Sequence, residues 1–347
     1  MKAADTAREG FNEVTSRERV LAALRLEKPD RVPYIEIGVD PAVADQLLGR
    51  PGRRDAPVMI EANERSVEEE KALARAMCKD NIVYILRAPI FADRLAGKDN
   101  RLFYGEGWIR SRDDLSKVVL PDPHSDELYR ELERFCAAKE DFALFLVTRA
   151  GFFPALLSMG MERFFIALHE DRGLVEELMD IYTDWTAAVA ARVCGMGIDV
   201  FVSTDDLAWK QGPMISPAMF RELVLPRFRR VAQKVKKPWI MHSDGNIMPL
   251  IDDLLSLGLA GLHPIEPEAM DIREVKRRWG NRVCLVGNVS LVTLGRGRPE
   301  QVEAEAQGLI RDLGPAGGYM LSSANSIASY VSVENVKAMA RVVKGQG

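Results

Sequence analysis

Two stretches decide the predicted fold: Pro-Trp-Ile-Met-His-Ser-Asp-Gly-Asn at 238–246 and Leu-Ala-Gly-Leu-His-Pro-Ile-Glu-Pro at 259–267. Each begins with the apolar residues of a buried strand and ends in polar side chains that can bind a ligand. Between them, apolar residues recur at helical spacing, which predicts a helix. Parallel strands joined by a helix end at the same edge of a sheet, where α/β enzymes keep their chemistry.

The rest of the chain repeats this alternation of strand and helix. A strand is expected at each of eight apolar segments: 32–38, 81–86, 143–147, 199–203, 239–241, 259–262, 282–286 and 318–321. Eight such units predict a (β/α)8 TIM barrel, with a hairpin at 102–109 inserted after the second strand. We expect one barrel domain at 15–347 and a flexible tail at 1–14. No strand is followed by a glycine-rich phosphate loop, which argues against a nucleotide site.

The composition is that of a globular protein, with 47% hydrophobic and 28% charged residues among 347. The net charge of −4 argues against nucleic acid as a partner. No apolar run reaches the roughly 20 residues of a membrane span, and 1–11 lacks a signal peptide's apolar core. The four cysteines are scattered without Cys-x-x-Cys spacing. We therefore expect a cytoplasmic protein with reduced thiols, no membrane contact and no nucleic acid bound.

Several motifs together resemble the uroporphyrinogen decarboxylase superfamily. They are Ser-Arg-Glu-Arg-Val-Leu-Ala-Ala-Leu at 16–24, Lys-Pro-Asp-Arg-Val-Pro at 28–33, Gly-Pro-Met-Ile-Ser-Pro-Ala-Met-Phe-Arg-Glu-Leu-Val-Leu-Pro at 212–226, His-Ser-Asp-Gly-Asn at 242–246 and Gly-Gly-Tyr-Met-Leu-Ser-Ser at 317–323. That superfamily also contains corrinoid-dependent methyltransferases. Its barrel and metal site are similar to those of cobalamin-independent methionine synthase.

Within this superfamily the decarboxylase branch fits less well. Decarboxylases carry an arginine-rich segment after the first strand, which holds the carboxylates of the tetrapyrrole. Here the corresponding stretch presents Glu36 and Asp40, and no histidine stands at Ala324 or Asn325. A polycarboxylate substrate needs fixed cations, so we expect the methyltransferase branch.

The resemblance implies a zinc site with a changed ligand set. The methyltransferase pattern is His-x-Cys after the fifth strand and Cys after the eighth, and methionine synthase adds a Glu on the sixth. In this chain His242 matches the histidine, Asp244 and Asn325 replace the two cysteines, and Glu266 lies 22 residues beyond Asp244. We expect His242, Asp244 and Glu266 to be both zinc ligands and catalytic residues.

Asp206, after the fourth strand, is a candidate fourth ligand, although Asp205 and Asp206 could instead anchor the next loop. The His-x-Asp pair could likewise be only a hydrogen-bonded loop anchor. His263 is expected to pack against or support the site. Oxygen and nitrogen ligands suit an oxygen substrate better than a thiol.

Two arginines at strand ends and two aromatic residues on loops at the same face are candidate substrate contacts, together with Asn325. Arg87 and Arg149 could hold a carboxylate through two hydrogen bonds each, or could pair with Glu36 or Asp205. Phe152 and Trp209 could line an aromatic pocket, as could Phe153, or could cover the core.

The sequence therefore predicts a metal-dependent methyltransferase that moves a methyl group from a small methylated molecule to cobalt. The preferred donor is an aryl methyl ether, whose oxygen zinc would activate as a leaving group. The chain has no corrinoid-binding Asp-x-His-x-x-Gly segment, so the corrinoid is expected on a partner protein. A homodimer is allowed by the sequence. The alternatives are a decarboxylase, a methyltransferase with a thiol acceptor and a binding protein without catalysis.

Overall fold

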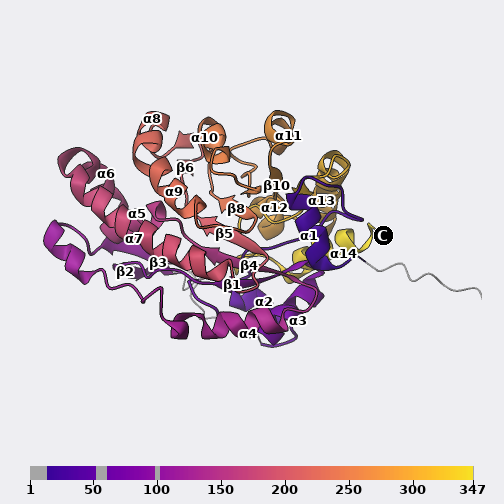
Figure 1. Ribbon diagram of the computed structural model, residues 1–347. Helices are drawn as coiled ribbons and strands as arrows, with labels where there is room; N and C mark the ends of the chain where they lie inside the picture. The colour runs from indigo at the N-terminus through magenta and orange to yellow at the C-terminus, as the bar shows by residue number, and fades with distance from the viewer. Residues whose placement is uncertain (1–13, 52–60, 98–101, 347) are drawn as a thin grey trace, which may run out of the picture.

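The computed structural model describes residues 14–51, 61–97 and 102–346. Of the tail predicted at 1–14, only Val14 lies within the described residues. The fold within them is built around one parallel sheet with helices on its outer side (Figure 1).

Seven parallel strands form this curled sheet, and their order in space follows their order in the chain. They are β1 (Asn81–Ile85), β4 (Ala143–Thr148), β5 (Val200–Thr204), β8 (Trp239–His242), β9 (Gly261–His263), β10 (Cys284–Val286) and β11 (Tyr319–Met320). Every residue of these strands is buried, as expected for parallel strands covered on both faces. The sheet is consistent with a TIM-barrel-like fold.

The predicted strand at 32–38 is not a regular strand, and that prediction is wrong. The segment makes only an isolated parallel bridge between Tyr34 and Leu321, with a second bridge just beyond it, at Val39. On its other side it makes one main-chain hydrogen bond, from Asp80 N–H to the Tyr34 carbonyl at 2.6 Å, and is otherwise bonded to side chains. Tyr34 N–H donates to Asp80 at 2.9 Å, and the Glu36 main chain exchanges two hydrogen bonds with the Asn81 side chain, at 2.9 and 3.1 Å.

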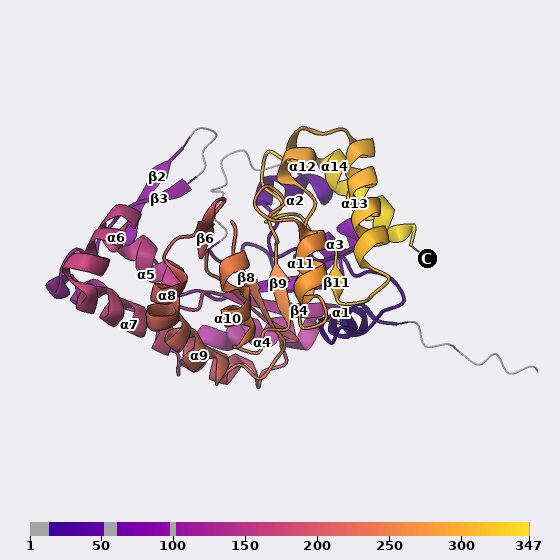
Figure 2. The same cartoon turned by 90° about the horizontal axis from the view of Figure 1, so that it is seen from above.

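Fourteen α-helices lie in the described residues, and most flank the sheet (Figures 1 and 2). They are α1 (Ser16–Leu24), α2 (Pro41–Leu47), α3 (Val67–Met77), α4 (Arg130–Ala138), α5 (Phe152–Met159), α6 (Met161–Glu170), α7 (Arg172–Val193), α8 (Pro217–Met219), α9 (Leu225–Ala232), α10 (Ile251–Leu255), α11 (Ile272–Trp279), α12 (Leu291–Arg296), α13 (Pro299–Leu313) and α14 (Val333–Lys344). Short 3-10 segments are η2 (Arg112–Lys117), η3 (Asp126–Tyr129) and η5 (Met248–Leu250), and η4 (Phe220–Val224) is a π-helical turn. None of the helices in the described ranges is long and apolar enough to cross a bilayer.

Sequence signals at the helix starts explain several of these boundaries. Thr15 caps α1 and Ser66 caps α3, each in a capping box with a glutamate three residues on. Asp171 and Ser216 cap α7 and α8 with their side chains.

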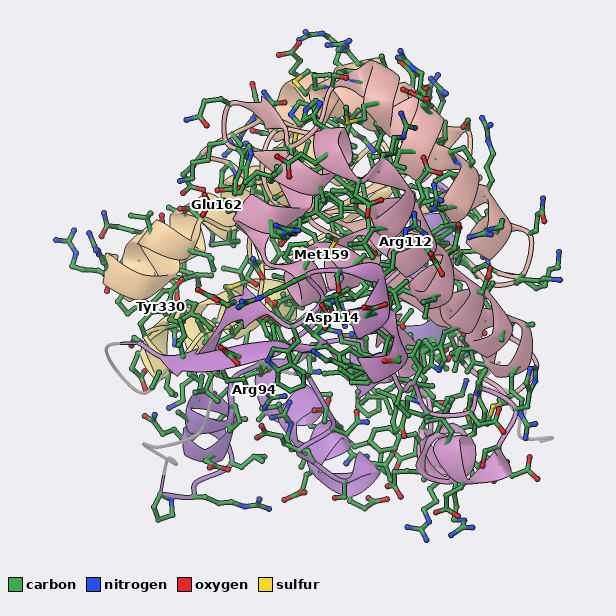
Figure 3. All side chains as sticks on the ribbon, turned by 90° about the vertical axis from the view of Figure 1, so that its left-hand side faces the viewer. Arg94, Arg112, Asp114, Met159, Glu162 and Tyr330 are labelled. Carbon is green, nitrogen blue, oxygen red and sulfur yellow. The ribbon has the colours of Figure 1, made fainter. Side chains whose placement is uncertain are left out.

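Two antiparallel pairs stand apart from the main sheet. β2 (Ala92–Ala96) pairs with β3 (Leu102–Gly107), and β6 (Ala208–Trp209) pairs with β7 (Gly212–Pro213). β3 packs on α5 so closely that a Cβ at Gly107 would lie 2.2 Å from the main chain of Met159. Figure 3 faces this side of the molecule, with Arg94 of β2 and Met159 of α5 labelled.

A second core inside the curled sheet decides where a site can lie. Strand side chains such as Phe145, Val200 and Ile240 meet there with Val20 and Leu24 of α1. The N–H of Arg17 donates to the carbonyl of Asp141, just before β4, so α1 covers the amino ends of the strands. The carboxyl ends are therefore the end of the sheet left for a site.

Candidate metal centre

The carboxyl ends of β5 and β8 lie side by side. Thr204, the last residue of β5, pairs in register with His242, the last residue of β8. Asp205 N–H donates to the His242 carbonyl at 3.1 Å. Asp206 comes directly after Asp205, and Asp244 lies two residues beyond His242. The pairing of the two strands therefore brings these aspartates together from different loops.

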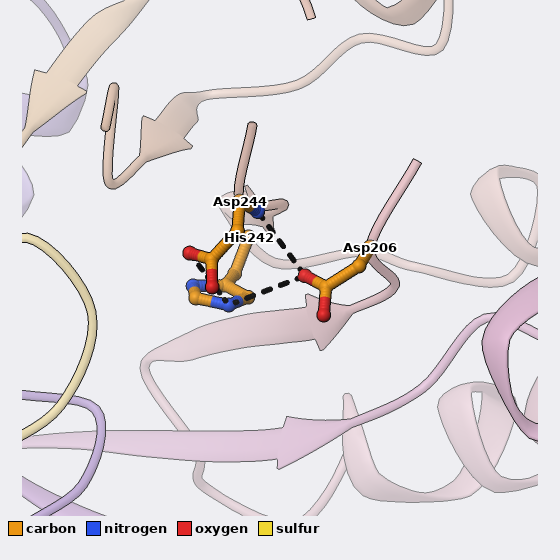
Figure 4. Close-up of side chains that lie close together, drawn as sticks. All are labelled: Asp206, His242 and Asp244. Carbon is orange, nitrogen blue, oxygen red and sulfur yellow. Dashed lines mark hydrogen bonds and ion pairs between the residues drawn. The ribbon is translucent and has the colours of Figure 1, made fainter. Parts of the chain in front are cut away.

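Asp206, His242 and Asp244 form a compact cluster of donor atoms (Figure 4). One donor atom from each residue lies within 4.8 Å of the other two. His242 Nε2 is 3.7 Å from Asp206 Oδ1 and 3.8 Å from Asp244 Oδ1. Asp244 N–H donates to Asp206 Oδ1 at 3.1 Å, which ties the two loops together. Three of the four predicted ligands are therefore neighbours.

His263 orients the His242 ring. Its Nδ1 lies 2.7 Å from His242 Nδ1, and its Nε2 lies 3.3 Å from the Ser322 hydroxyl. Burial lowers the pKa of His242 and lowers that of His263 well below its usual value, which favours the neutral form of both rings. The bond at Nδ1 leaves Nε2 of His242 as the atom facing the two carboxylates, which is how a metal-ligating histidine is usually held. His263, the last residue of β9, thus has the supporting place that the sequence predicted.

One side-chain oxygen of Asp244 has no hydrogen-bond partner. Asn325 Nδ2 donates to Oδ2 of Asp244 at 2.5 Å, whereas the buried Oδ1 makes no hydrogen bond. Burial raises the pKa of Asp244 well above its usual value, and the nearby Asp206 and Glu266 raise it further. A cation placed between these groups would favour the ionised carboxylate.

These residues fit a zinc ion. One imidazole nitrogen and two carboxylate oxygens are a donor set that zinc accepts in catalytic sites, which keep a further position for water or substrate. Asp206, His242 and Asp244 would hold it. The four cysteines, Cys78, Cys136, Cys194 and Cys284, are outside the cluster found in the described residues.

Glu266 lies close to this cluster but outside it. Its Oε2 accepts the Gly245 N–H at 2.8 Å, and its Oε1 lies 3.7 Å from Lys210 Nζ. The side chain therefore braces the loop that carries Asp244. Its role as a ligand stays a prediction.

Arg87 and Arg149 meet a residue that the sequence did not single out. Arg149 donates two hydrogen bonds of 2.7 Å to the carboxylate of Glu61, and Arg87 Nη1 lies 3.6 Å from the same group. Arg87 also donates to the Thr204 hydroxyl at 3.0 Å. Burial and the neighbouring Arg149 lower the pKa of Arg87 to about 10. Glu61 lies in a short polar segment before α3, and no sequence signal placed it at the strand ends.

The alternative partners considered for these arginines are engaged elsewhere. Glu36 accepts the N–H and the hydroxyl of Ser323. Asp205 accepts the N–H of Ala150 at 2.5 Å and that of Phe153 at 3.0 Å. Asp205 is therefore the loop anchor that the sequence allowed, and it fixes the turn that follows Arg149.

A cavity of about 190 Å³ joins the arginines to the cluster. Its walls include Glu61, Arg87, Arg149, Phe153, Thr204, Asp206, His242 and Asn325. Phe152 does not line it, because this first residue of α5 is buried edge-on against Phe164. Trp209 of β6 has an exposed side chain, and its carbonyl accepts the N–H of Asn246. The aromatic wall is thus supplied by Phe153, over which Arg149 lies at 6.0 Å.

The fold and these residues define a parallel α/β protein with a candidate metal centre at its strand ends. The chain belongs to the uroporphyrinogen decarboxylase (URO-D) family, whose model matches residues 106–346. The resemblance carried by its motifs is thereby confirmed.

Two named relatives illustrate the range of this family. The methylcobamide:CoM methyltransferase MtaA of Methanosarcina barkeri is 29% identical over 167 residues, 48% of this chain and 47% of that protein. The uroporphyrinogen decarboxylase of Coxiella burnetii (strain RSA 493 / Nine Mile phase I) is 24% identical over 185 residues, 51% of this chain and 49% of that protein. The chain spans about half the length of the curated relatives it matches.

Solved structures match over nearly the whole chain. A methyltransferase from Methanosarcina mazei covers 96% of this chain, and 99% of its own chain is matched, with a TM-score of 0.74 and 22% identity. The B12-independent methionine synthase of Shewanella sp. W3-18-1 covers 91% of this chain and matches over 98% of its own, with a TM-score of 0.54 and 9% identity. At these identities the likeness concerns the fold.

Proposed function

We propose that this protein is a zinc-dependent methyltransferase that takes a methyl group from a small methylated molecule and passes it to the cobalt of a separate corrinoid protein. The observation that carries the proposal is the cluster of Asp206, His242 and Asp244, with the unpartnered Oδ1 of Asp244. The similarity to a methylcobamide:CoM methyltransferase supports the type of reaction.

The preferred donor is an aryl methyl ether. A zinc ion, when bound, would supply a Lewis acid that withdraws charge from the ether oxygen. Asp206, His242 and Asp244 would hold that ion, and Glu266, through Gly245, would keep Asp244 in place. In the reaction the aryl O–CH3 bond breaks, a bond from the methyl carbon to Co(I) forms, and the phenolate takes a proton.

The surroundings of the cluster suit such a donor. The cavity of about 190 Å³ is small, and Phe153 offers a ring wall beside it. The nitrogen and oxygen donors lack the thiolates that suit activation of a thiol substrate, which favours an oxygen substrate.

The test combines metal content with methyl transfer. Purified protein should contain about one zinc per chain, and His242→Ala should lose most of it because only three clustered residues hold the ion. With a Co(I) corrinoid protein and a methoxylated phenol, the visible spectrum should change to that of methyl-Co(III) as free phenol forms. His242→Ala should abolish this change.

His169→Ala is the matched control, since this exposed histidine on α6 lies outside the cluster, and it should keep both zinc and activity. Unchanged zinc in His242→Ala would contradict the metal site. Failure across a panel of methoxyaromatics, together with release of CO2 from uroporphyrinogen, would favour a decarboxylase instead.

A further inference from the structure

The carboxylate of Glu61 occupies the cationic end of the cavity in the manner of a bound ligand. Arg149 Nη1 and Nη2 each donate to a different oxygen of Glu61, both at 2.7 Å. This two-point geometry is the one by which guanidinium recognises a planar carboxylate. Arg87 lies against the same carboxylate at 3.6 Å.

Glu61 reaches this place from a segment that is neither helix nor strand. Two residues later, Asn63 exchanges hydrogen bonds with the main chain of Ile85, donating to its carbonyl at 2.8 Å and accepting its N–H at 2.7 Å. Asn63 thus anchors the segment to the end of β1 independently of Glu61. The carboxylate of Glu61 can leave the arginines without releasing the segment.

Arg149 keeps a donor that Glu61 does not use. Its Nε is buried and has no hydrogen-bond partner. The carboxylate of Asp205 is turned toward the main-chain N–H groups of Ala150 and Phe153. Glu61 is therefore the carboxylate that a ligand's carboxylate would replace on Arg149.

The arginines and the cluster line the same cavity. Arg87 and Arg149 share its walls with Asp206 and His242. A small molecule can therefore contact both ends at once.

We propose that the substrate carries a carboxylate, which displaces Glu61 from Arg149 and Arg87 while the opposite end of the molecule faces Asp206, His242 and Asp244. The position of the methyl group at that opposite end rests on the proposed function. The carboxylate site itself does not, because it follows from the contacts of Glu61.

Calorimetric binding to the zinc-loaded full chain, without any corrinoid acceptor, tests this directly. Three matched probes are 4-methoxybenzoate, 4-methoxybenzenesulfonate and uncharged 4-methoxytoluene. The wild type should bind the carboxylate at least about tenfold more tightly than the neutral ether. Glu61→Gln should tighten binding of 4-methoxybenzoate about tenfold and change that of 4-methoxytoluene by less than about twofold.

Two further variants complete the design. Arg149→Lys keeps the charge but loses the two parallel N–H donors of the guanidinium group. It should weaken carboxylate binding about tenfold and leave binding of the neutral ether unchanged. Glu68→Gln removes an equal charge from an exposed position on α3 and should change nothing. If Arg149→Lys does not fold, Glu61→Gln alone decides the outcome.

Unchanged or weaker binding of 4-methoxybenzoate to Glu61→Gln, including no binding to either protein, would overturn the proposal. Tighter binding of the sulfonate than of the carboxylate would overturn the substrate class. If the carboxylate binds as expected but no methyl group reaches cobalt, the proposed methyl transfer fails and the carboxylate site stands.

Discussion

Glu36 is a carboxylic acid held in the interior beside the end of β11. It is fully buried, and it accepts the N–H of Ser323 at 2.9 Å and the Ser323 hydroxyl at 2.6 Å. Burial raises the pKa of Glu36 to about 7, and the hydrogen bonds from Ser323 oppose this rise only in part. Glu36 therefore changes its charge near neutral pH in the folded protein.

The pH dependence of stability follows from this raised pKa. Between the pKa of an unfolded glutamate and about 7, the folded state holds a proton that the unfolded state has lost, so stability falls as pH rises. Above about pH 7 the loss is complete and amounts to about 3 kcal/mol. The amide in Glu36→Gln cannot titrate, so this variant should not show that loss of stability.

Urea unfolding of both proteins at pH 4.5, 6 and 8 measures this difference. The stability of the wild type relative to Glu36→Gln should decline by about 3 kcal/mol across the series. The same series on Glu68→Gln should run parallel to the wild type. A constant difference between wild type and Glu36→Gln at all three pH values would contradict the raised pKa.

At the scale of elements, the predictions succeeded where main-chain pairing decides the structure. Strands were expected at 239–241 and 259–262, and the structure has β8 and β9 there, with His242 and His263 at their ends. Apolar runs bounded by polar turns carry that information directly. The neighbourhood of Asp206 and His242 could be expected for the same reason, since both follow adjacent strands.

The predictions failed where side chains replace the main-chain ladder. The segment at 32–38 is apolar like a strand, yet its partners on one side are the side chains of Asp80 and Asn81. Glu61 reaches the site through the anchor of Asn63 on Ile85, a contact between residues 22 apart in the chain. No local pattern encodes such long-range contacts, so a single sequence does not reveal them.

Gly245 shows how two elements are fitted together at the candidate metal centre. Its φ is +78°, and a Cβ there would lie 2.4 Å from the carbonyl oxygen of Ala208 in β6. This contact sets the β6–β7 pair against the loop that carries Asp244. A side chain at 245 would therefore push that loop away from β6.

Gly245→Ala should destabilise the protein by more than about 2 kcal/mol, because strain and overpacking act together, and should reduce the zinc content that the proposed function expects. Gly258→Ala is the matched control, since Gly258 has a similar φ of +80° but open space around it. That variant should lose only about 1 kcal/mol and keep its zinc. Equal effects on stability and zinc in the two variants would show that the contact with Ala208 is unimportant. Urea unfolding and metal analysis provide both measurements.

The two ends of the parallel sheet differ in structure. At the amino ends of the strands, α1 packs against the inner core and the chain is tied together by buried ion pairs. At the carboxyl ends, the chain leaves a cavity and a cluster in which the buried Oδ1 of Asp244 has no hydrogen-bond partner. This division is typical of barrel enzymes, in which one end stabilises and the other reacts.

Asp80 connects several elements at the amino ends of the strands. Its buried carboxylate accepts hydrogen bonds from Ser16 and Arg19 of α1, from Arg31, and from the N–H of Tyr34, all between 2.8 and 2.9 Å. It stands immediately before β1, so it links α1, the segment at 32–39 and the sheet. Removing its charge would leave the buried guanidinium of Arg19 with Asp30 as its remaining carboxylate partner.

Asp80→Asn should therefore lower the free energy of unfolding by about 3–5 kcal/mol, the usual cost of breaking a buried ion pair from one side. Asp126→Asn removes an exposed partner of Arg192 and should cost less than about 1 kcal/mol. Urea unfolding followed by both circular dichroism and tryptophan fluorescence checks the two values. If Asp80 joins the whole molecule, the two probes should shift together for Asp80→Asn. A separate early transition, with the main one unmoved, would instead mean that Asp80 only anchors α1 to the finished sheet.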